Sequence, residues 1–232
     1  MLFVYSGEVH ELNAILLEKL GKKHVLTTIP ATPSDMASAK HVTEYFRQEG
    51  IRARLLGARY YRVAERLRNI LKNSRALYLM GGNTFEFLAY AQRIELFSML
   101  SEFEAGGGII LCESAGSIIL SPNIATALIP TTCPDDHTLE LESYAGMGRI
   151  PFHLSPHYEP DAEQAKHELD ELQLLANYSG IPVMVLQDGE GFIMEEQRIT
   201  RIIGKPVELK PEDKPVSNME IEGLLPKWAA SV

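Results

Sequence analysis

The chain alternates short apolar runs with longer stretches in which apolar residues recur three and four positions apart. The short runs predict buried strands, and the periodic stretches, such as the one with Leu12, Ile15 and Leu16, predict amphipathic helices. The pattern predicts strands at 2–5, 25–29, 51–56, 75–80 and from 109, and helices at 8–20, 36–49, 61–73, 84–90 and 95–105. Strands that alternate with helices are typical of βαβ units, so the sequence predicts an α/β fold with a mostly parallel sheet.

The pattern changes after Leu120. Residues 121–148 are rich in Pro, Thr, Asp and Gly without sustained periodicity, which predicts a long loop of the kind that carries function or covers a site. Beyond it the sequence predicts a strand at 150–154, an acidic helix at 162–178, a strand at 181–186, a β-hairpin at 192–203, and a surface strand and tail from 204. The 232 residues, 45% of them hydrophobic, are enough for one full α/β core, so we expect a single domain over residues 1–232.

The composition argues against several functions. The net charge is −9, from 22 basic and 31 acidic residues, without a dense Lys/Arg cluster, so nucleic acid is not an expected partner. No apolar run approaches the ~20 residues that cross a bilayer, and the first residues enter a strand directly, so we expect a cytoplasmic protein without a membrane partner. Cys112 and Cys133 form no disulfide framework and no metal-ligand spacing, so we expect neither a metal nor a cofactor.

Ser114 stands on a predicted turn between a strand and a short apolar helix. Ala115 and Gly116 are small enough to permit a sharp bend, which would project the hydroxyl above the sheet. The amide of Ala115, at the helix start, would then form half of an oxyanion hole. Ser114 is therefore either a nucleophile or a helix cap, and both hypotheses remain open. Cys112 stands where the G-x-S-x-G nucleophile elbow has its first glycine, so the motif is incomplete.

A second candidate turn follows the strand predicted at 75–80. Gly81 and Gly82 let the backbone approach a ligand closely, although any strand-to-helix turn can carry such a pair. Asn83, with Glu86 three residues later, resembles a capping box for the next helix. Ligands of open α/β sheets bind beyond the carboxyl ends of strands, and both this turn and Ser114 lie there.

Two further candidates follow later strands. His157 has a proline on each side, which restricts its backbone and suits an imidazole that must point one way. A lone histidine is more often structural, and His153 is its nearest rival. Asp188 follows the strand predicted at 181–186, but an aspartate before a turn glycine is common without any function.

With these pieces in order, the chain resembles the aspartyl dipeptidase (dipeptidase E) and cyanophycinase family of serine peptidases, and its dipeptidase branch more closely. The segments that carry the resemblance are Gly81-Gly82-Asn83-Thr84-Phe85, Ser114-Ala115-Gly116, Ser155-Pro156-His157-Tyr158 and, more weakly, Leu186-Gln187-Asp188-Gly189. The match spans residues 75–195, while the first 70 residues agree only in their alternation of strands and helices. The resemblance implies a three-layer fold similar to class I glutamine amidotransferases, with helices on both faces of the sheet.

The resemblance also implies a catalytic machinery. Ser114 would be the nucleophile on a nucleophile elbow, His157 the base, and the amides of Gly82 and Ala115 the oxyanion hole. The reaction implied is the hydrolysis of a peptide bond near the free N-terminus of a small peptide, which is the expected partner. A homodimer remains open.

The third triad member and the substrate contacts are less defined. The family pattern has glutamate at the position of Asp188, which we expect to be the orienting acid on a side chain shorter by one methylene. Asp135, in the long loop, is the competing candidate because family members have an aspartate in the corresponding loop. By the same resemblance the substrate would contact Gly81, Asn83 and Tyr158.

A departure from the family bears on the substrate. The dipeptidase carries arginine in the helix after its histidine segment, whereas residues 151–197 here contain no arginine, only Lys166 and several acids. We therefore do not expect aspartyl specificity. Three alternatives remain: an amidotransferase-like enzyme with a cysteine nucleophile, an esterase or amidase, and a catalytically idle relative that binds a peptide or metabolite.

Overall fold

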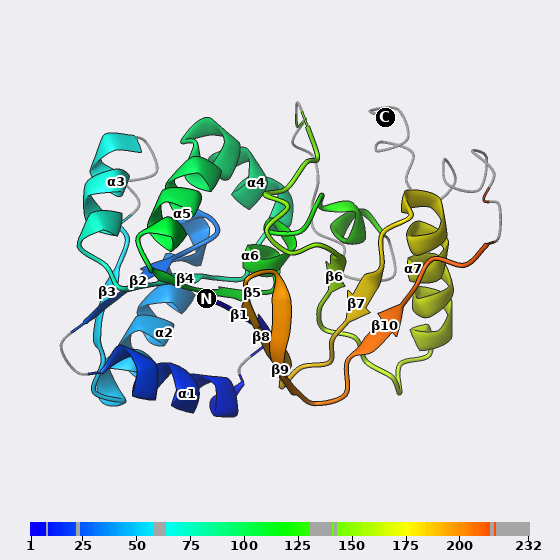
Figure 1. Cartoon of the computed structure of the whole chain (residues 1–232), viewed down its shortest axis with the longest axis horizontal. Coiled ribbons are helices and arrows are strands. Elements are labelled where there is room, and N and C mark those ends of the chain that lie inside the picture. Colours follow the sequence, from blue (N-terminus) through cyan, green and yellow to red (C-terminus); the bar gives the residue numbers. More distant parts are fainter. Residues whose placement is uncertain are drawn as a thin grey trace.

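The computed structural model describes residues 1–7, 9–21, 24–57, 64–129, 141, 143–213 and 216 of the chain. A seven-stranded sheet, in the order β3-β2-β4-β5-β1-β8-β9, forms its centre (Figure 1). The strands are β1 (Leu2–Ser6), β2 (Val25–Ile29), β3 (Arg52–Leu55), β4 (Ala76–Leu79), β5 (Ile109–Glu113), β8 (Glu190–Glu195) and β9 (Arg198–Ile203). Strands β1 to β5 run parallel, while β8 pairs antiparallel with β1 and β9 with β8. The predicted α/β fold and its hairpin are confirmed.

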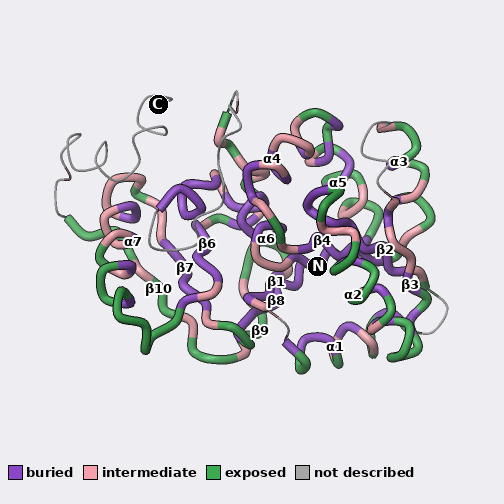
Figure 2. The backbone as a smooth tube through the Cα atoms, turned by 180° about the vertical axis from the view of Figure 1, so that it is seen from behind, coloured by how far each residue is buried: buried purple, intermediate pink, exposed green. Residues whose placement is uncertain are grey.

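Helices cover both faces of this sheet. One face carries α1 (His10–Leu20) and α2 (Met36–Gln48), and the other carries α3 (Ala64–Lys72), α4 (Thr84–Arg93), α5 (Leu96–Ala105) and the short α6 (Ala115–Ile118). Alternate strand residues point to opposite faces, so Phe3 and Tyr5 join the apolar cluster under α1 and α2, whereas Leu2 and Val4 join the cluster on the other side. The buried strands between exposed helix faces (Figure 2) form the three layers that the resemblance implies.

A second, smaller sheet was not predicted. It contains β6 (His153–Ser155), β7 (Val183–Val185) and β10 (Val207–Leu209), and α7 (Ala165–Ser179) packs against it. The strands predicted at 150–154 and 181–186 thus exist but lie outside the main sheet. Because β8 already pairs with the free side of β1, β6 and β7 cannot add there and pair with each other instead.

The carboxyl ends of several strands converge where the two sheets meet. Strands β4, β5 and β1 are parallel neighbours, so the residues that follow β4 and β5 lie beside the end of β1. The amide of Gly189 donates to the carbonyl of Ser6, and the amide of Leu186 donates to the carbonyl of Ser155, at 2.9 Å each. These bonds join the segment after β7 both to β1 and to β6, and so hold it beside the end of the main sheet.

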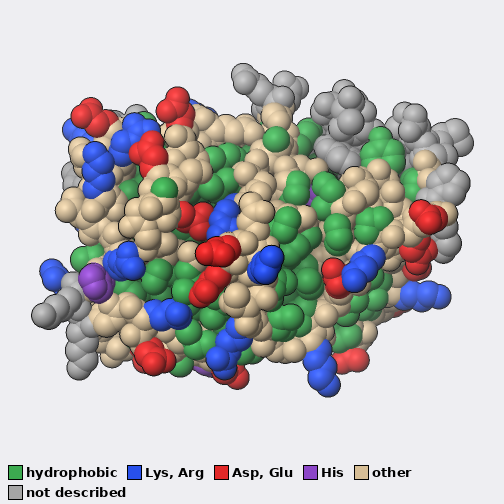
Figure 3. Space-filling view, viewed as in Figure 1, with side chains coloured by type: hydrophobic (Ala, Val, Ile, Leu, Met, Phe, Trp, Pro, Cys, Tyr) green, Lys and Arg blue, Asp and Glu red, His purple; other side chains and the backbone are tan. Residues whose placement is uncertain are grey.

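One face of the molecule carries charges of both signs. On the face in Figure 3, Lys and Arg side chains are interspersed with Asp and Glu rather than gathered in one patch. Among the helices described, none combines the length and apolar character needed to span a membrane.

Candidate active site

Ser114 has a backbone conformation that residues other than glycine rarely adopt, with φ 49° and ψ −120°. It links β5 to α6, and its carbonyl accepts hydrogen bonds from the amides of Ser117 and Ile118 at 2.8 and 3.0 Å. Within the described residues, its hydroxyl makes no capping bond to that helix. The hypothesis that the Ser114 side chain caps the helix is therefore wrong, and the turn presents the hydroxyl elsewhere.

Two glycines make room for this turn. A Cβ on Gly116 would lie 2.3 Å from the carbonyl oxygen of Leu79, so only glycine lets α6 pack so closely on the end of β4. A Cβ on Gly81 would lie 3.1 Å from the Cβ of Ser114. The predicted Gly-Gly turn therefore lies directly against the serine.

Cys112, which replaces the first glycine of the elbow motif, is part of the core. It is fully buried in β5, and its thiol donates a hydrogen bond to the carbonyl of Phe3 at 3.4 Å. Burial, reinforced by the nearby charge of Glu104, raises the pKa of the thiol well above its ordinary value. Cys112 therefore remains a thiol, which argues against a cysteine nucleophile.

The imidazole of His157 lies between the other two predicted triad members. Its Nε2 is 2.8 Å from Oγ of Ser114, and its Nδ1 is 2.6 Å from Oδ1 of Asp188. An ionised carboxylate only accepts hydrogen bonds, so Nδ1 carries the proton and Nε2 accepts from the serine hydroxyl. This tautomer is the one that a general base needs. Like Ser114, His157 has a positive φ, of 63°.

Asp188 reaches the imidazole from the turn that follows β7. Its side chain is 69% exposed, against 34% for that of His157, so water screens the charge of this pair. The second acid candidate, Asp135, lies outside the described residues. Of the two acid candidates, Asp188 is therefore the one that is seen in contact with His157.

His153, the rival histidine, does not belong to this cluster. It is fully buried on β6, and neither ring nitrogen has a hydrogen-bond partner in the described structure. Burial lowers its pKa to about 4, so the ring is neutral at physiological pH.

The remaining predicted residues lie at or just before the starts of α4 and α6. Gly82 has a φ of 142°, and a Cβ there would lie 2.6 Å from Oδ2 of Asp35, so the turn is closely covered. Ala115 is the first residue of α6. Oδ1 of Asn83 accepts a hydrogen bond from the amide of Glu86 at 2.9 Å, so Asn83 caps α4 as the pattern indicates.

The profile of Peptidase family S51 matches residues 3–202. The chain belongs to this family. It is 34% identical over 88 residues to the uncharacterized peptidase Lmo0363 of Listeria monocytogenes, covering 38% of this chain and 42% of the relative. It is 28% identical over 137 residues to a Peptidase E of Shewanella amazonensis, covering 57% and 56%.

Another relative is a probable alpha-aspartyl dipeptidase of Drosophila melanogaster, 29% identical over 124 residues, or 51% of this chain and 49% of the relative. The chain spans about half the length of the curated relatives it matches. Among solved structures, a putative Peptidase E protein from Listeria monocytogenes superimposes with a TM-score of 0.69 at 21% identity, covering 88% of this chain and 98% of that one. The fold is therefore shared, and the resemblance drawn from the motifs is confirmed.

An acidic cavity of about 450 Å³ opens beside the imidazole of this S51 member. Its lining residues are His157, Tyr158, Glu159, Pro160, Asp161, Ala162, Gln187 and Asp188. Among these residues three are acids and none is Lys or Arg. Nearby, Glu168 is buried on α7, and burial followed by the charges of Glu171 and Glu159 raises its pKa to about 7. The surroundings of His157 therefore disfavour negative charge.

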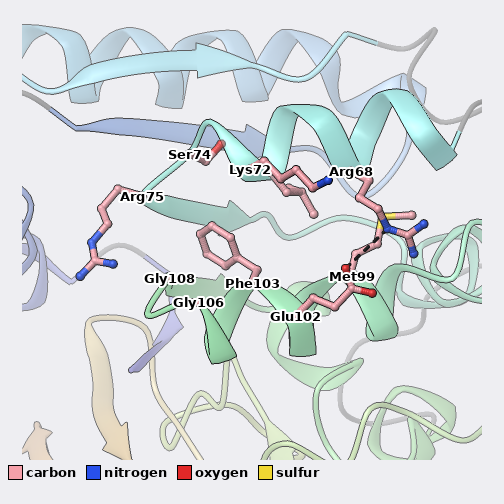
Figure 4. A pocket seen from close by; sticks show the side chains of 10 residues that line it. Arg68, Lys72, Ser74, Arg75, Met99, Glu102, Phe103, Gly106 and Gly108 are labelled. Carbon is pink, nitrogen blue, oxygen red and sulfur yellow. Dashed lines mark ion pairs between the residues drawn. The ribbon is translucent and has the colours of Figure 1, made fainter.

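A second cavity, of about 260 Å³, lies between α3 and α5 at the opposite edge of the sheet (Figure 4). Arg75 and Gly108, which line it, directly precede β4 and β5. Arg68 forms an ion pair with Glu102 at 3.6 Å across its mouth. This cavity contains none of the predicted site residues and lies away from the triad.

Arg149, an arginine that precedes the histidine segment in the chain, forms an ion pair with Glu104. Its Nε lies 2.8 Å from Oε2 of Glu104, and both side chains are largely buried. The N-terminal amine lies 3.9 Å from the same Glu104 carboxylate, which places the pair near the amino end of β1, away from Ser114. Within the described ranges, no group of His, Cys, Asp or Glu is arranged to hold a metal ion.

Proposed function

We propose that this chain is a serine-type peptidase that hydrolyses short peptides, as a dipeptidase or aminopeptidase would. The observation that carries the proposal is the continuous hydrogen-bonded chain from Ser114 through His157 to Asp188, built on a strained turn at the carboxyl edge of the sheet. Membership of a peptidase family supports the same reaction class.

The geometry supports acyl transfer in two steps. Nε2 of His157 takes the Ser114 proton while Oγ bonds to the substrate carbonyl carbon, and the carbonyl oxygen becomes an oxyanion. The amides of Gly82 and Ala115 are the proposed donors to that oxyanion. When the carbon–nitrogen bond breaks, His157 returns the proton to the leaving amine. Water, deprotonated by the same imidazole, then releases the acyl group and restores the serine.

Asp188 orients the ring in this mechanism and stabilises the imidazolium that forms. Its bond to Nδ1 selects the tautomer with a free Nε2 lone pair. Because the carboxylate is mostly exposed, its electrostatic contribution is screened by water, and its main effect is to hold the ring in place.

We further propose that the enzyme does not prefer aspartyl peptides. The cavity beside His157 is lined by Glu159, Asp161 and Asp188, which repel a substrate carboxylate and favour neutral or basic groups. Of the described arginines, Arg149 and Arg68 pair with Glu104 and Glu102, away from this cavity.

An esterase or amidase would use the same three residues, so the choice between these activities rests on turnover. A panel of dipeptides, aminoacyl amides and simple esters should be assayed with the wild type and with Ser114→Ala. Ser121→Ala is the control, because Ser121 is a buried serine that belongs to none of the predicted site segments, and its hydroxyl has no partner within the described residues. We expect dipeptide turnover that Ser114→Ala abolishes and Ser121→Ala retains.

A fluorophosphonate probe separates an enzyme from an idle relative. An activated Ser114 should react rapidly with the probe, and the variant Ser114→Ala should not react. Ester turnover without dipeptide turnover would favour the esterase, and no labelling at all would favour an idle binding protein.

A further inference from the structure

Ser6, the last residue of β1, connects two of the segments that carry the triad. It is completely buried, and its Oγ accepts a hydrogen bond from the amide of His157 at 2.8 Å. The same Oγ lies 3.3 Å from the carbonyl oxygen of Leu186 and 3.4 Å from Oδ1 of Asp188. One hydroxyl therefore touches the backbone of the histidine, the carboxylate that orients it, and the end of the strand that carries this carboxylate.

The hydroxyl of Ser6 has one proton and two acceptors within reach. It accepts from the amide of His157, so its own proton goes to Leu186 or to Asp188. Both acceptor distances are longer than the usual 2.7–2.8 Å of an O–H···O bond, as expected for a proton shared between alternatives. In either state the hydroxyl links the backbone of His157 to the segment that contains Leu186 and Asp188.

The backbone of His157 is strained and needs hydrogen bonds from its surroundings to hold it. Its φ of 63° is unfavourable for a side chain larger than glycine, and strain of this kind persists only where the surroundings hold it. The amide of His157 donates to Ser6, and the next amide, that of Tyr158, donates to the carbonyl of Leu186 at 2.9 Å. Ser6 therefore supplies one of two bonds that fix the direction of the imidazole.

The residue after Ser6 fits the same interpretation. Gly7 has a φ of 66°, and a Cβ there would lie 3.0 Å from Oδ1 of Asp188. Glycine therefore leaves room for the carboxylate to approach β1 and the Ser6 hydroxyl.

We propose that Ser6 is a positioning residue of the triad, which holds His157 and Asp188 in register with Ser114 through a single buried hydroxyl. The inference rests on the proposed function. Within the described residues the Ser6 hydroxyl bonds to His157, Leu186 and Asp188 but not to Ser114, so we expect its loss to slow the chemical step without weakening substrate binding.

The test compares Ser6→Ala with Ser6→Thr, which keeps a hydroxyl, and with Ser155→Ala. Ser155 is a matched control because it is a fully buried serine two residues before His157, whose hydroxyl has no partner in the described structure. A misplacement of the catalytic geometry by ~1 Å costs ~10²-fold, so we expect Ser6→Ala to lower kcat by ~10- to 100-fold. KM should stay within about twofold, Ser6→Thr should restore much of kcat, and Ser155→Ala should match the wild type. Thermal unfolding of each variant checks that it is folded.

A double-mutant cycle with Asp188→Ala excludes a purely structural role. If Ser6 acts through the triad, Ser6→Ala should cost much less in the Asp188→Ala background than in the wild type. Equal losses in both backgrounds, or a folded Ser6→Ala with wild-type kcat, would overturn the role of Ser6 alone. A wild type without Ser114-dependent turnover or fluorophosphonate labelling would overturn the proposed function and the role of Ser6 with it.

Discussion

Ser114 and His157 lie 43 positions apart in the chain, yet Oγ of one and Nε2 of the other are 2.8 Å apart. Both residues have a positive φ, of 49° and 63°. Such strain is rare outside glycine, costs of order 1–3 kcal/mol at each position, and concentrates at functional sites. Two strained residues whose side chains form a hydrogen bond are therefore a stronger indication of catalysis than either alone.

We predict that Ser114→Ala and His157→Ala each lower kcat by ~10³-fold or more, because members of such a unit fail together. The double variant should be no worse than the slower single variant. Steady-state assays on the best dipeptide substrate, with circular dichroism to confirm folding, provide the measurement. Substantial residual turnover in either single variant would contradict the assignment.

Asp188, rather than Asp135, is the predicted orienting acid. Because Asp188 selects the His157 tautomer, we expect Asp188→Ala and Asp188→Asn to lower kcat by ~10²-fold or more. Asp135→Ala, measured in the same assay, should retain activity within a few-fold. The opposite ranking of the two aspartates would assign the role to Asp135.

The local chemistry of the site could be predicted from the sequence, but its long-range connections could not. Gly81, Gly82 and Ser114 follow strands that the apolar pattern marks clearly, and parallel strands bring such positions to one edge. Ser6 gave no signal, because a serine before a glycine at a strand end is common. Its importance comes from a contact with His157 across 151 positions.

The division into two sheets was unpredictable for a similar reason. The runs around β6 and β7 have the same apolar character as the strands of the main sheet, so composition does not show which partner each strand takes. The antiparallel pairing of β8 with β1 determines which strands join the main sheet, and this pairing depends on contacts between distant parts of the chain. The predicted hairpin was correct, but its place in the main sheet was not apparent.

Substrate preference provides a third prediction. We expect Asp-Leu to be hydrolysed no faster than Ala-Leu, because a substrate carboxylate in this cavity would lie beside Glu159 and Asp161, and the cavity lining contains no Lys or Arg. Values of kcat/KM for Asp-Leu, Ala-Leu and Lys-Leu measure the preference directly.

Charge reversal tests the cavity itself. Glu159→Lys and Asp161→Lys should raise kcat/KM for Asp-Leu relative to Ala-Leu, while Glu159→Gln, which only removes a charge, should have a smaller effect in the same direction. A tenfold or greater preference of the wild type for Asp-Leu would show that a cation outside the cavity lining binds the substrate.

The last prediction concerns stability at acidic pH and depends on His153. Its pKa is about 4 in the folded protein, because the ring is buried without a hydrogen-bond partner among the described residues, against an ordinary value of 6.5. Between these values the unfolded chain binds a proton that the folded chain does not. The contribution of His153 is therefore fully present above pH 6.5 and is lost as the pH falls toward 4. The 2.5-unit difference corresponds to about 3 kcal/mol of unfolding free energy.

Replacing the ring removes this dependence on pH. We expect His153→Leu, which keeps an apolar side chain of comparable size, to reduce the loss of unfolding free energy between pH 7 and pH 4.5 by about 2 kcal/mol. Urea titrations at the two pH values measure the difference, and His24→Gln, at an exposed histidine, is the control. If His153→Leu and the wild type lost the same stability over this interval, then His153 would already carry a proton in the folded protein, and carboxyl groups alone would account for the loss in acid.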